Sequence, residues 1–394
     1  MRSRSIITLV VIVACITLFV PESWCQDFNV EWRSVFGAEG SDVGSFVQPT
    51  VDGGYVFVGT TDSFGAGETD AWLVKTDMYG NEEWSRTFGG EFADMGKSVR
   101  QTSDGGYIIT GATRSFGAGK RDVWLIKTDM YGNEEWSRTF GGPEWEYGRS
   151  VEQTDDGGYI IAGYTNSFGV GSSYNIWLIK TNAGGALQWQ KTFGGRWKDY
   201  GYSVQQTTDG GYIVTGETSS FGSGDYDIWL IKTDAQGNME WENTFGGIGV
   251  DRGRDGIQTA DGGYIVTGYT TSFGAGLEDA WLIKTDAQGN MEWENTFGGS
   301  EVDRGRIVMQ TPEGGYIFGG YTASFGSGFD DMWVVRTDMN GNRIWSWTFG
   351  KEYYMDRVTS VIQTDDRGLV VLGQSRLIGT HDYDVQIMKL KAGR

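Results

Sequence analysis

The sequence contains few of the residues that most catalytic and metal sites require. Of its 394 residues only two are cysteines, Cys15 and Cys25, and only one is a histidine, His381. This shortage argues against Ser-His triads, histidine-ligated zinc or iron sites and thiol nucleophiles. An enzyme built on this chain would have to use carboxylate, tyrosine, arginine or lysine side chains, and the sequence predicts neither a metal nor a cofactor.

Other shortages disfavour disulfide bonds, nucleic-acid binding and disorder. Both cysteines lie in or beside an N-terminal apolar segment, so disulfides do not hold the rest of the chain together, and a chain of this length buries a sufficient core without them. The formal net charge of −20 disfavours a nucleic-acid partner, because surfaces that bind phosphates are basic. Four prolines beside 63 glycines indicate tight turns between short strands rather than a disordered chain.

The first residues have the features of an export signal. Two arginines precede an apolar run from Ile6 to Val20, which Pro21 ends. Because this run is short for a membrane-spanning helix, we predict that residues 1–25 are a cleaved signal peptide; an uncleaved membrane anchor is the alternative. Residues 26–394 would then form one secreted or cell-surface domain, with membrane contact only through that anchor.

Beyond this segment the chain is one unit repeated about every 52 residues. Each unit has a turn of the Asp-Gly-Gly type, a first tryptophan about twenty residues later, a second one twelve residues further on, and then a Phe-Gly pair. Self-similarity at such a period is typical of propellers and repeat arrays. The first tryptophan recurs at Trp72, Trp124, Trp177, Trp229, Trp281 and Trp333, and the second at Trp32, Trp84, Trp136, Trp189, Trp241, Trp293 and Trp345.

Each unit is expected to form four strands, which in one copy are Ser98 to Thr102, Tyr107 to Thr113, Val123 to Thr128 and Glu134 to Phe140. The two middle strands are apolar at consecutive positions, which indicates a sheet covered on both faces. Four-stranded sheets repeated radially, each packed between its neighbours, make a β-propeller. The seven units therefore predict an all-β, seven-bladed propeller of antiparallel blades.

The two ends of the chain predict how the ring closes. The repeats begin with an unpartnered fourth strand, Asn29 to Phe36, and end with three strands, within Val358 to Leu390, that lack a fourth. If these segments share one sheet, hydrogen bonds between the N- and C-terminal strands close the ring.

The segment KTDAQGNMEW, Lys232 to Trp241, resembles the tryptophan-docking motif of quinoprotein-type propellers. Asp234, Gly237 and Trp241 match the Asp, Gly and Trp of that motif, with one fewer residue before the glycine. The resemblance implies that tryptophans lock adjacent blades together. Quinone-using members also carry a vicinal cysteine pair and cofactor ligands, neither of which this sequence shows, so the resemblance extends to architecture and not to a quinone site.

The copies diverge most in the segments that enter the third to seventh units, which propellers place around one mouth of the channel. Aromatic residues suit stacking on sugar rings or gripping a protein partner. We therefore predict a non-catalytic protein that binds a carbohydrate or a protein there. The alternative is that the sequence differences are neutral drift in the loops between duplicated blades. The candidate ligand-binding residues are Trp145, Tyr147, Trp197, Tyr200, Tyr202, Arg252 and Arg304.

An acidic residue recurs ten residues after each second tryptophan, and eleven residues after it in the last unit. We consider three interpretations of these acids. Paired carboxylates could serve a glycoside hydrolase or polysaccharide lyase, clustered ones could bind calcium, and an acid in every unit is more simply a turn cap. Among enzyme candidates Asp255 stands out, since other units have serine there. An exposed acidic ring would favour neutral sugars or a basic partner and repel anions. The acids are Asp42, Asp94, Glu146, Asp199, Asp251, Asp303 and Asp356.

A purely structural surface component is the remaining hypothesis. Residues Trp229 to Gly247 and Trp281 to Gly299 are nearly identical, which indicates selection for blades rather than for one site.

Overall fold

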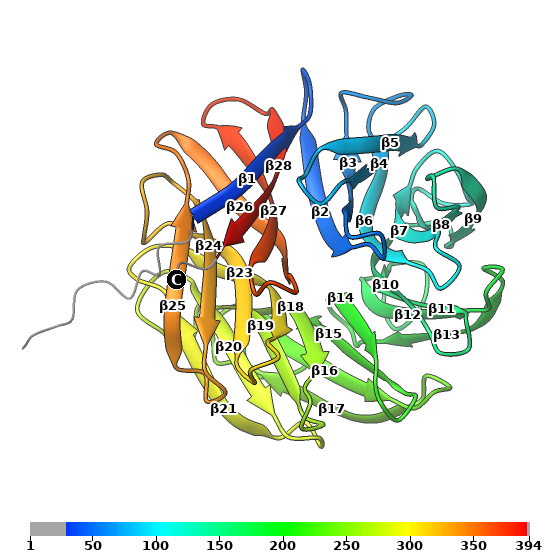
Figure 1. Cartoon of the computed structure of the whole chain (residues 1–394). Coiled ribbons are helices and arrows are strands. Elements are labelled where there is room, and N and C mark those ends of the chain that lie inside the picture. The colour runs from blue at the N-terminus through cyan, green and yellow to red at the C-terminus, as the bar shows by residue number, and fades with distance from the viewer. Residues whose placement is uncertain (1–28, 392–394) are drawn as a thin grey trace, which may run out of the picture.

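A computed structural model describes residues 29–391 of the chain. The predicted signal peptide and both cysteines lie outside the described residues. The described part contains 28 β-strands in seven four-stranded antiparallel sheets, which stand around a central channel (Figure 1). The predicted seven-bladed β-propeller is thus confirmed. No helix within residues 29–391 is long and apolar enough to cross a membrane.

Six blades are each formed by four strands that follow one another in the chain, and the first strand of each lines the channel. In the first three blades these are β2 (Asp42–Pro49), β3 (Tyr55–Thr61), β4 (Asp70–Thr76) and β5 (Glu82–Phe88); β6 (Asp94–Gln101), β7 (Tyr107–Thr113), β8 (Asp122–Thr128) and β9 (Glu134–Phe140); and β10 (Glu146–Gln153), β11 (Tyr159–Thr165), β12 (Asn175–Thr181) and β13 (Leu187–Phe193). In the next three they are β14 (Asp199–Gln206), β15 (Tyr212–Thr218), β16 (Asp227–Thr233) and β17 (Met239–Phe245); β18 (Asp251–Gln258), β19 (Tyr264–Thr270), β20 (Asp279–Thr285) and β21 (Met291–Phe297); and β22 (Asp303–Gln310), β23 (Tyr316–Thr322), β24 (Asp331–Thr337) and β25 (Arg343–Phe349).

The seventh blade joins the two ends of the chain. It contains β26 (Tyr354–Gln363), β27 (Leu369–Leu377), β28 (Tyr383–Lys391) and, as its outer strand, β1 (Asn29–Phe36). The antiparallel pairing of β1 with β28 runs from Asn29 opposite Lys391 to Phe36 opposite Val385, and the two strands lie side by side in Figure 1. The predicted closure of the ring by its terminal strands is confirmed.

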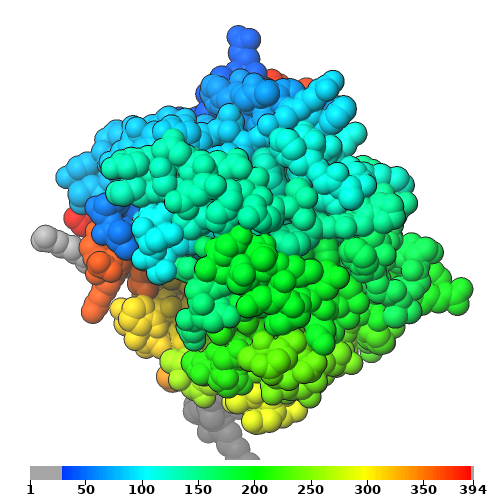
Figure 2. All heavy atoms as spheres, turned by 90° about the vertical axis from the view of Figure 1, so that its right-hand side faces the viewer, coloured from blue at the N-terminus to red at the C-terminus, as the bar shows by residue number. Residues whose placement is uncertain are grey.

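The core consists of layers between adjacent blades rather than one central cluster. In one layer Ile176 and Leu178 of β12 pack with Val214 of β15 and Trp229 of β16. The middle strands are buried along nearly their whole length because each face meets a different neighbouring sheet. In Figure 2 the atoms of the second to fourth blades, cyan to green, pack against one another and cover the face turned to the viewer.

The second tryptophan of a unit locks its blade to the next one. Gly289, in the turn between β20 and β21, has a φ of 79°, and a Cβ atom there would lie 2.5 Å from the Trp241 ring of the preceding blade. Trp241 also contacts Tyr264, with ring centroids 5.5 Å apart. In the equivalent turn of its own blade, the Asp234 carboxylate accepts hydrogen bonds from two backbone N–H groups and the Asn238 side chain. The predicted tryptophan docking is therefore present in the fold.

The inner strands begin earlier than predicted. The strand expected from Ser98 is β6, which begins at Asp94. A β-bulge between Gly96 and Ser98 interrupts the alternation of side chains, and Lys97 at the bulge faces the channel, so this part has no apolar pattern to identify it as a strand. The same extension occurs in the other blades. The repeated acids and the candidate residues Tyr147, Tyr200, Tyr202, Arg252 and Arg304 therefore lie on inner strands and not in loops.

Candidate functional site

The seven repeated acids are buried turn caps. The Asp251 carboxylate accepts hydrogen bonds from the hydroxyls of Thr270 and Ser272 and from the N–H of Gly247. Carboxylates satisfied in this way are not free to act on a substrate or to attract a cation. The expected exposed acidic ring is wrong, because the exposed fraction of each of the seven residues is 1% or less: Asp42, Asp94, Glu146, Asp199, Asp251, Asp303 and Asp356.

Asp255 is also buried, but it connects its blade to the two neighbouring blades. It lines the middle of the channel, as expected, but one carboxylate oxygen accepts a hydrogen bond from the Ser203 hydroxyl (2.7 Å) and the other from the N–H of Val308 (3.0 Å). These partners belong to the fourth and sixth blades, on either side of its own. Burial raises the pKa of the Asp255 carboxyl above its ordinary value. Asp255 thus links three blades.

Five tyrosines form a continuous aromatic group at the channel mouth, on the side where the inner strands begin. Tyr147 and Tyr164 have ring centroids 4.9 Å apart, and Tyr164 and Tyr200 have centroids 4.8 Å apart. Tyr174 and Tyr202 each contact Tyr200 as well. We call this group the tyrosine arc, and each of its members is partly exposed. The sequence analysis missed Tyr164 and Tyr174; the signal for Tyr164 was its position in the second strand, which varies between copies.

Three arginines continue the mouth around the fifth to seventh blades, and we call them the arginine arc. Each guanidinium lies over a tyrosine ring, 4.3 to 4.7 Å from its centroid, and pairs with a carboxylate. The pairing neutralises part of their charge but fixes each planar group beside the channel. The sets are Arg252 with Tyr226 and Glu217, Arg304 with Tyr269 and Glu278, and Arg357 with Tyr321 and Asp330.

The two candidate tryptophans lie in the loops before β10 and β14. Trp145 is partly exposed, with the Arg121 guanidinium 5.5 Å from its ring centroid. Trp197 is 58% exposed, with the Arg196 guanidinium 5.1 Å from its ring centroid. No ring contact within residues 29–391 joins the two tryptophans, so the structure brings together the predicted tyrosines but leaves Trp197 apart.

Below the mouth the channel narrows to a throat with a volume of about 290 Å³. The bulge of each inner strand directs one side chain into it, and four of the seven are cationic. Tyr202 lies between two of them, with guanidinium carbons 5.1 and 4.5 Å from its ring centroid. Of this set the sequence analysis named only Tyr202 as a candidate ligand-binding residue, although the other positions also vary between copies. The seven residues are Ser45, Lys97, Arg149, Tyr202, Arg254, Arg306 and Thr359.

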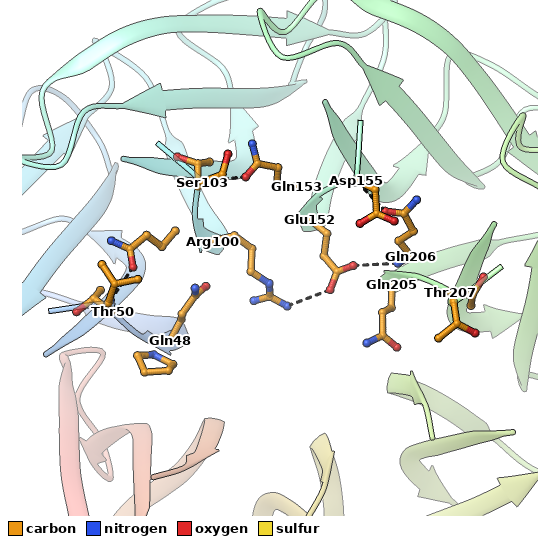
Figure 3. Close-up of a pocket in the computed structure, with 15 residues that line it drawn as sticks. Gln48, Thr50, Arg100, Ser103, Glu152, Gln153, Asp155, Gln205, Gln206 and Thr207 are labelled. Carbon is orange, nitrogen blue, oxygen red and sulfur yellow. Dashed lines mark hydrogen bonds and ion pairs between the residues drawn. The ribbon is translucent and has the colours of Figure 1, made fainter. Parts of the chain in front are cut away.

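The opposite end of the channel opens into a larger cavity of about 890 Å³ (Figure 3). Glutamines that end the inner strands accept hydrogen bonds from backbone N–H groups of the preceding blade; Gln153 accepts from Ser103 at 2.8 Å. Arg100 and Glu152 point toward each other across the wall, 3.9 Å apart. The polar groups at this end are thus largely satisfied by one another, and their pattern repeats from blade to blade. No group of acidic, histidine or cysteine side chains in the described chain could hold a metal ion.

Comparisons with known proteins define the class of the protein but no narrower identity. No protein-family model and no curated protein matches the chain. Similar solved structures include the Neurospora crassa Pan2 WD40 domain (TM-score 0.57, 11% identity, covering 92% of this chain and 95% of that one) and the polysaccharide lyase Uly1 (0.55, 11%, 91% and 92%). Sqt1 from Chaetomium thermophilum has a TM-score of 0.50 at 10% identity, covering 93% of this chain and all of that one. At these identities the likeness shows the fold alone. The chain is a seven-bladed β-propeller repeat protein.

Proposed function

We propose that the protein is an exported or cell-surface, non-catalytic binding propeller, and that its ligand is a carbohydrate held at the mouth formed by the tyrosine and arginine arcs. The observation that carries this proposal is the place where the blades differ most in sequence, which is this mouth of the channel. At this end, partly exposed tyrosines from several strands adjoin arginines, whereas the opposite end repeats the same hydrogen bonds from blade to blade.

The chemistry of the mouth suits an acidic sugar chain. Tyrosine rings offer flat apolar faces on which the C–H face of a sugar stacks, and guanidinium groups donate paired hydrogen bonds to carboxylate or sulfate groups. The burial of the seven acids removes the reason for expecting a preference for neutral sugars, because the charged residues that line the throat below the mouth are cationic. A protein ligand would use the same aromatic and arginine residues and is the other outcome of the test below.

The enzyme alternative finds less support in the geometry. Glycoside hydrolysis needs two carboxyl groups on either side of the scissile bond, whereas the seven repeated acids and Asp255 are engaged with backbone and hydroxyl donors. Tyr202 could be considered as a base for a lyase, but burial raises its pKa to about 12, opposite to what proton abstraction near neutral pH requires.

The proposal is tested by applying residues 26–394 to an array of neutral and uronate- or sulfate-bearing glycans and assaying the bound glycans for cleavage. Binding of acidic glycans without cleavage is expected. Tyr200→Ala should weaken binding about tenfold or more, as loss of a modest hot spot does. The matched control is Tyr131→Ala, which removes an exposed tyrosine in the turn between β8 and β9, at the other face. Absence of glycan binding, or equal losses in the two variants, would contradict the proposal, and cleavage would replace it with the enzyme alternative.

A further inference from the structure

The throat gathers four cationic side chains from four blades onto one small cavity. Lys97 comes from β6, Arg149 from β10, Arg254 from β18 and Arg306 from β22, and all four line the same 290 Å³ space. These residues are about 50 to 210 positions apart in the chain, so only the closed ring brings them together. The formal charge of the whole chain is −20, which makes a cationic throat a local exception to its composition.

The throat itself has no carboxylate in its lining. Its remaining lining consists of uncharged residues. The same four cations also line the next part of the channel, where Asp255 and Glu152 are found; Asp255 accepts hydrogen bonds from Ser203 and Val308, and Glu152 lies 3.9 Å from Arg100.

The nearest carboxylate is Glu217, which is fully buried, lies 3.7 Å from Arg254 and is already paired with Arg252 at 2.9 Å. In the part of the chain that the structure describes, Lys97, Arg149 and Arg306 have no carboxylate within ion-pair distance. These partly exposed cations face one another in one small cavity, and three of them have no ion-pair partner, so they repel one another. A purely structural role does not account for the set.

The state of Lys97 reflects this imbalance. Removal from water, followed by the charges of Arg149, Arg121 and Arg306, lowers the pKa of the Lys97 ammonium to about 7. The inner strands on either side of β6 present the uncharged Ser45 on β2 and the cationic Arg149 on β10. Further round the ring the groups are Tyr202, Arg254, Arg306 and Thr359, and the carboxylates Glu152 and Asp255 line the adjoining part of the channel. An anion in the throat would offset the repulsion among the cations and favour the protonated lysine.

We propose that the throat is an oxyanion site, in which Lys97, Arg149, Arg254 and Arg306 bind one sulfate, phosphate or carboxylate group. Guanidinium groups donate pairs of hydrogen bonds that match such groups, and the lysine adds a compact positive charge. The cavity has room for one small anion, free or at the end of a larger ligand. The proposal goes beyond the carbohydrate function above, because it concerns the throat and applies to inorganic ions.

The site is tested by titrating residues 26–394 with sodium sulfate and with sodium phosphate in a calorimeter at pH 6, at constant ionic strength set with chloride. We expect at least one of the two anions to bind with one-to-one stoichiometry. Lys97→Met and Arg306→Gln should each weaken that binding about tenfold or more. The matched control is Arg343→Gln, which removes an exposed arginine on the outer strand β25 and should leave the affinity unchanged.

A pH series separates a role of Lys97 in binding from a general loss of charge. Affinity of the unaltered protein should fall between pH 6 and pH 8.5 as Lys97 loses its proton. Lys97→Arg, whose guanidinium stays charged, should keep its affinity at pH 8.5, whereas Lys97→Met should bind weakly at both values. If neither anion binds, or if Lys97→Met binds as tightly as Arg343→Gln, the inference is wrong. Because the probes are inorganic, failure of the glycan experiment does not affect this result.

Discussion

The two ends of the channel are formed by the same seven inner strands, yet the residues at one end vary much more from blade to blade than those at the other. At the end where the inner strands finish, six of the seven blades have glutamine at the same position, from Gln101 to Gln363, and five of these accept a hydrogen bond from the backbone of the preceding blade. At the other end the capping acid is equally uniform, but the residues next to it change from blade to blade.

The difference separates two kinds of position in a duplicated sequence. A residue that meets the neighbouring blade, such as Gln153 or Trp241, meets the same surroundings in every copy, so the same side chain recurs. A residue that points into the shared channel meets all seven blades at once. Lys97 and Arg149 occupy equivalent places in two blades, yet they help to form one common cavity. We therefore interpret uniform positions as joints between blades and variable ones as the lining of the candidate site.

The largest expected effect comes from breaking the joint between the ends of the chain. Deleting Asp27 to Gly37 removes β1 and leaves β28 with an unpaired edge, and unpaired edges promote aggregation. We expect loss of the soluble monomer, measured by size-exclusion chromatography. A soluble deletion variant with the same cooperative thermal transition would contradict the assigned role of the terminal pairing.

Removing one docking tryptophan should have the next largest effect. Trp241→Ala leaves a cavity against Gly289 and Tyr264 of the following blade, and we expect it to lower the free energy of unfolding by roughly 3–5 kcal/mol. Denaturant titration measures the loss. Glycan and sulfate binding should persist below the new transition; their loss would show that blade joints and channel lining are not separable.

A glutamine joint should contribute less. Gln206→Ala removes the acceptor for the backbone N–H of Asp155, and loss of one partly exposed hydrogen bond should cost about 1 kcal/mol. The same titration applies, with binding at the opposite mouth unchanged. A loss as large as that for Trp241→Ala would mean that the glutamines do more than join adjacent blades.

Lys97 should make stability depend on pH in a direction opposite to that of an ordinary ion pair. Its pKa in the folded protein, about 7, lies below the value of 10.5 that it has when unfolded. Between these values the unfolded chain binds more protons, so the contribution of Lys97 to stability increases as the pH rises through this range. Lys97→Met should therefore stabilise the protein at pH 6 relative to its parent, with the difference shrinking toward pH 10. Melting curves of both proteins in chloride buffers across this range measure it; a constant difference would contradict the lowered pKa.

The smallest effect on stability is expected at an exposed loop residue. Trp197→Ala should change the free energy of unfolding by less than about 1 kcal/mol, because its ring is 58% exposed. If the ligand reaches this loop, binding should weaken by about 1–3 kcal/mol, as measured on a bound glycan. A stability loss near that of Trp241→Ala would show that the loop belongs to the framework.

Much of the architecture could be predicted from local signals. Glycine turns, paired apolar strands and recurring tryptophans each occur within one unit, so a single copy predicts a blade and seven copies predict the ring. The strands Tyr107 to Thr113 and Glu134 to Phe140 were predicted with the bounds that the structure gives them. The start of β6 at Asp94 was missed, because a strand that faces a polar channel through a bulge has no apolar periodicity.

By itself the sequence determined the number of blades, their strand order, the closure by β1 and β28 and the docking of tryptophans on glycines. All of these depend on contacts within a unit or between consecutive units, which the repeat itself encodes. Only the tertiary structure decided that the repeated acids are buried and that Lys97, Arg149, Arg254 and Arg306 share one throat. The physical reason is that residues from all seven blades contribute to the charge of the channel, and these residues come together only when the ring closes.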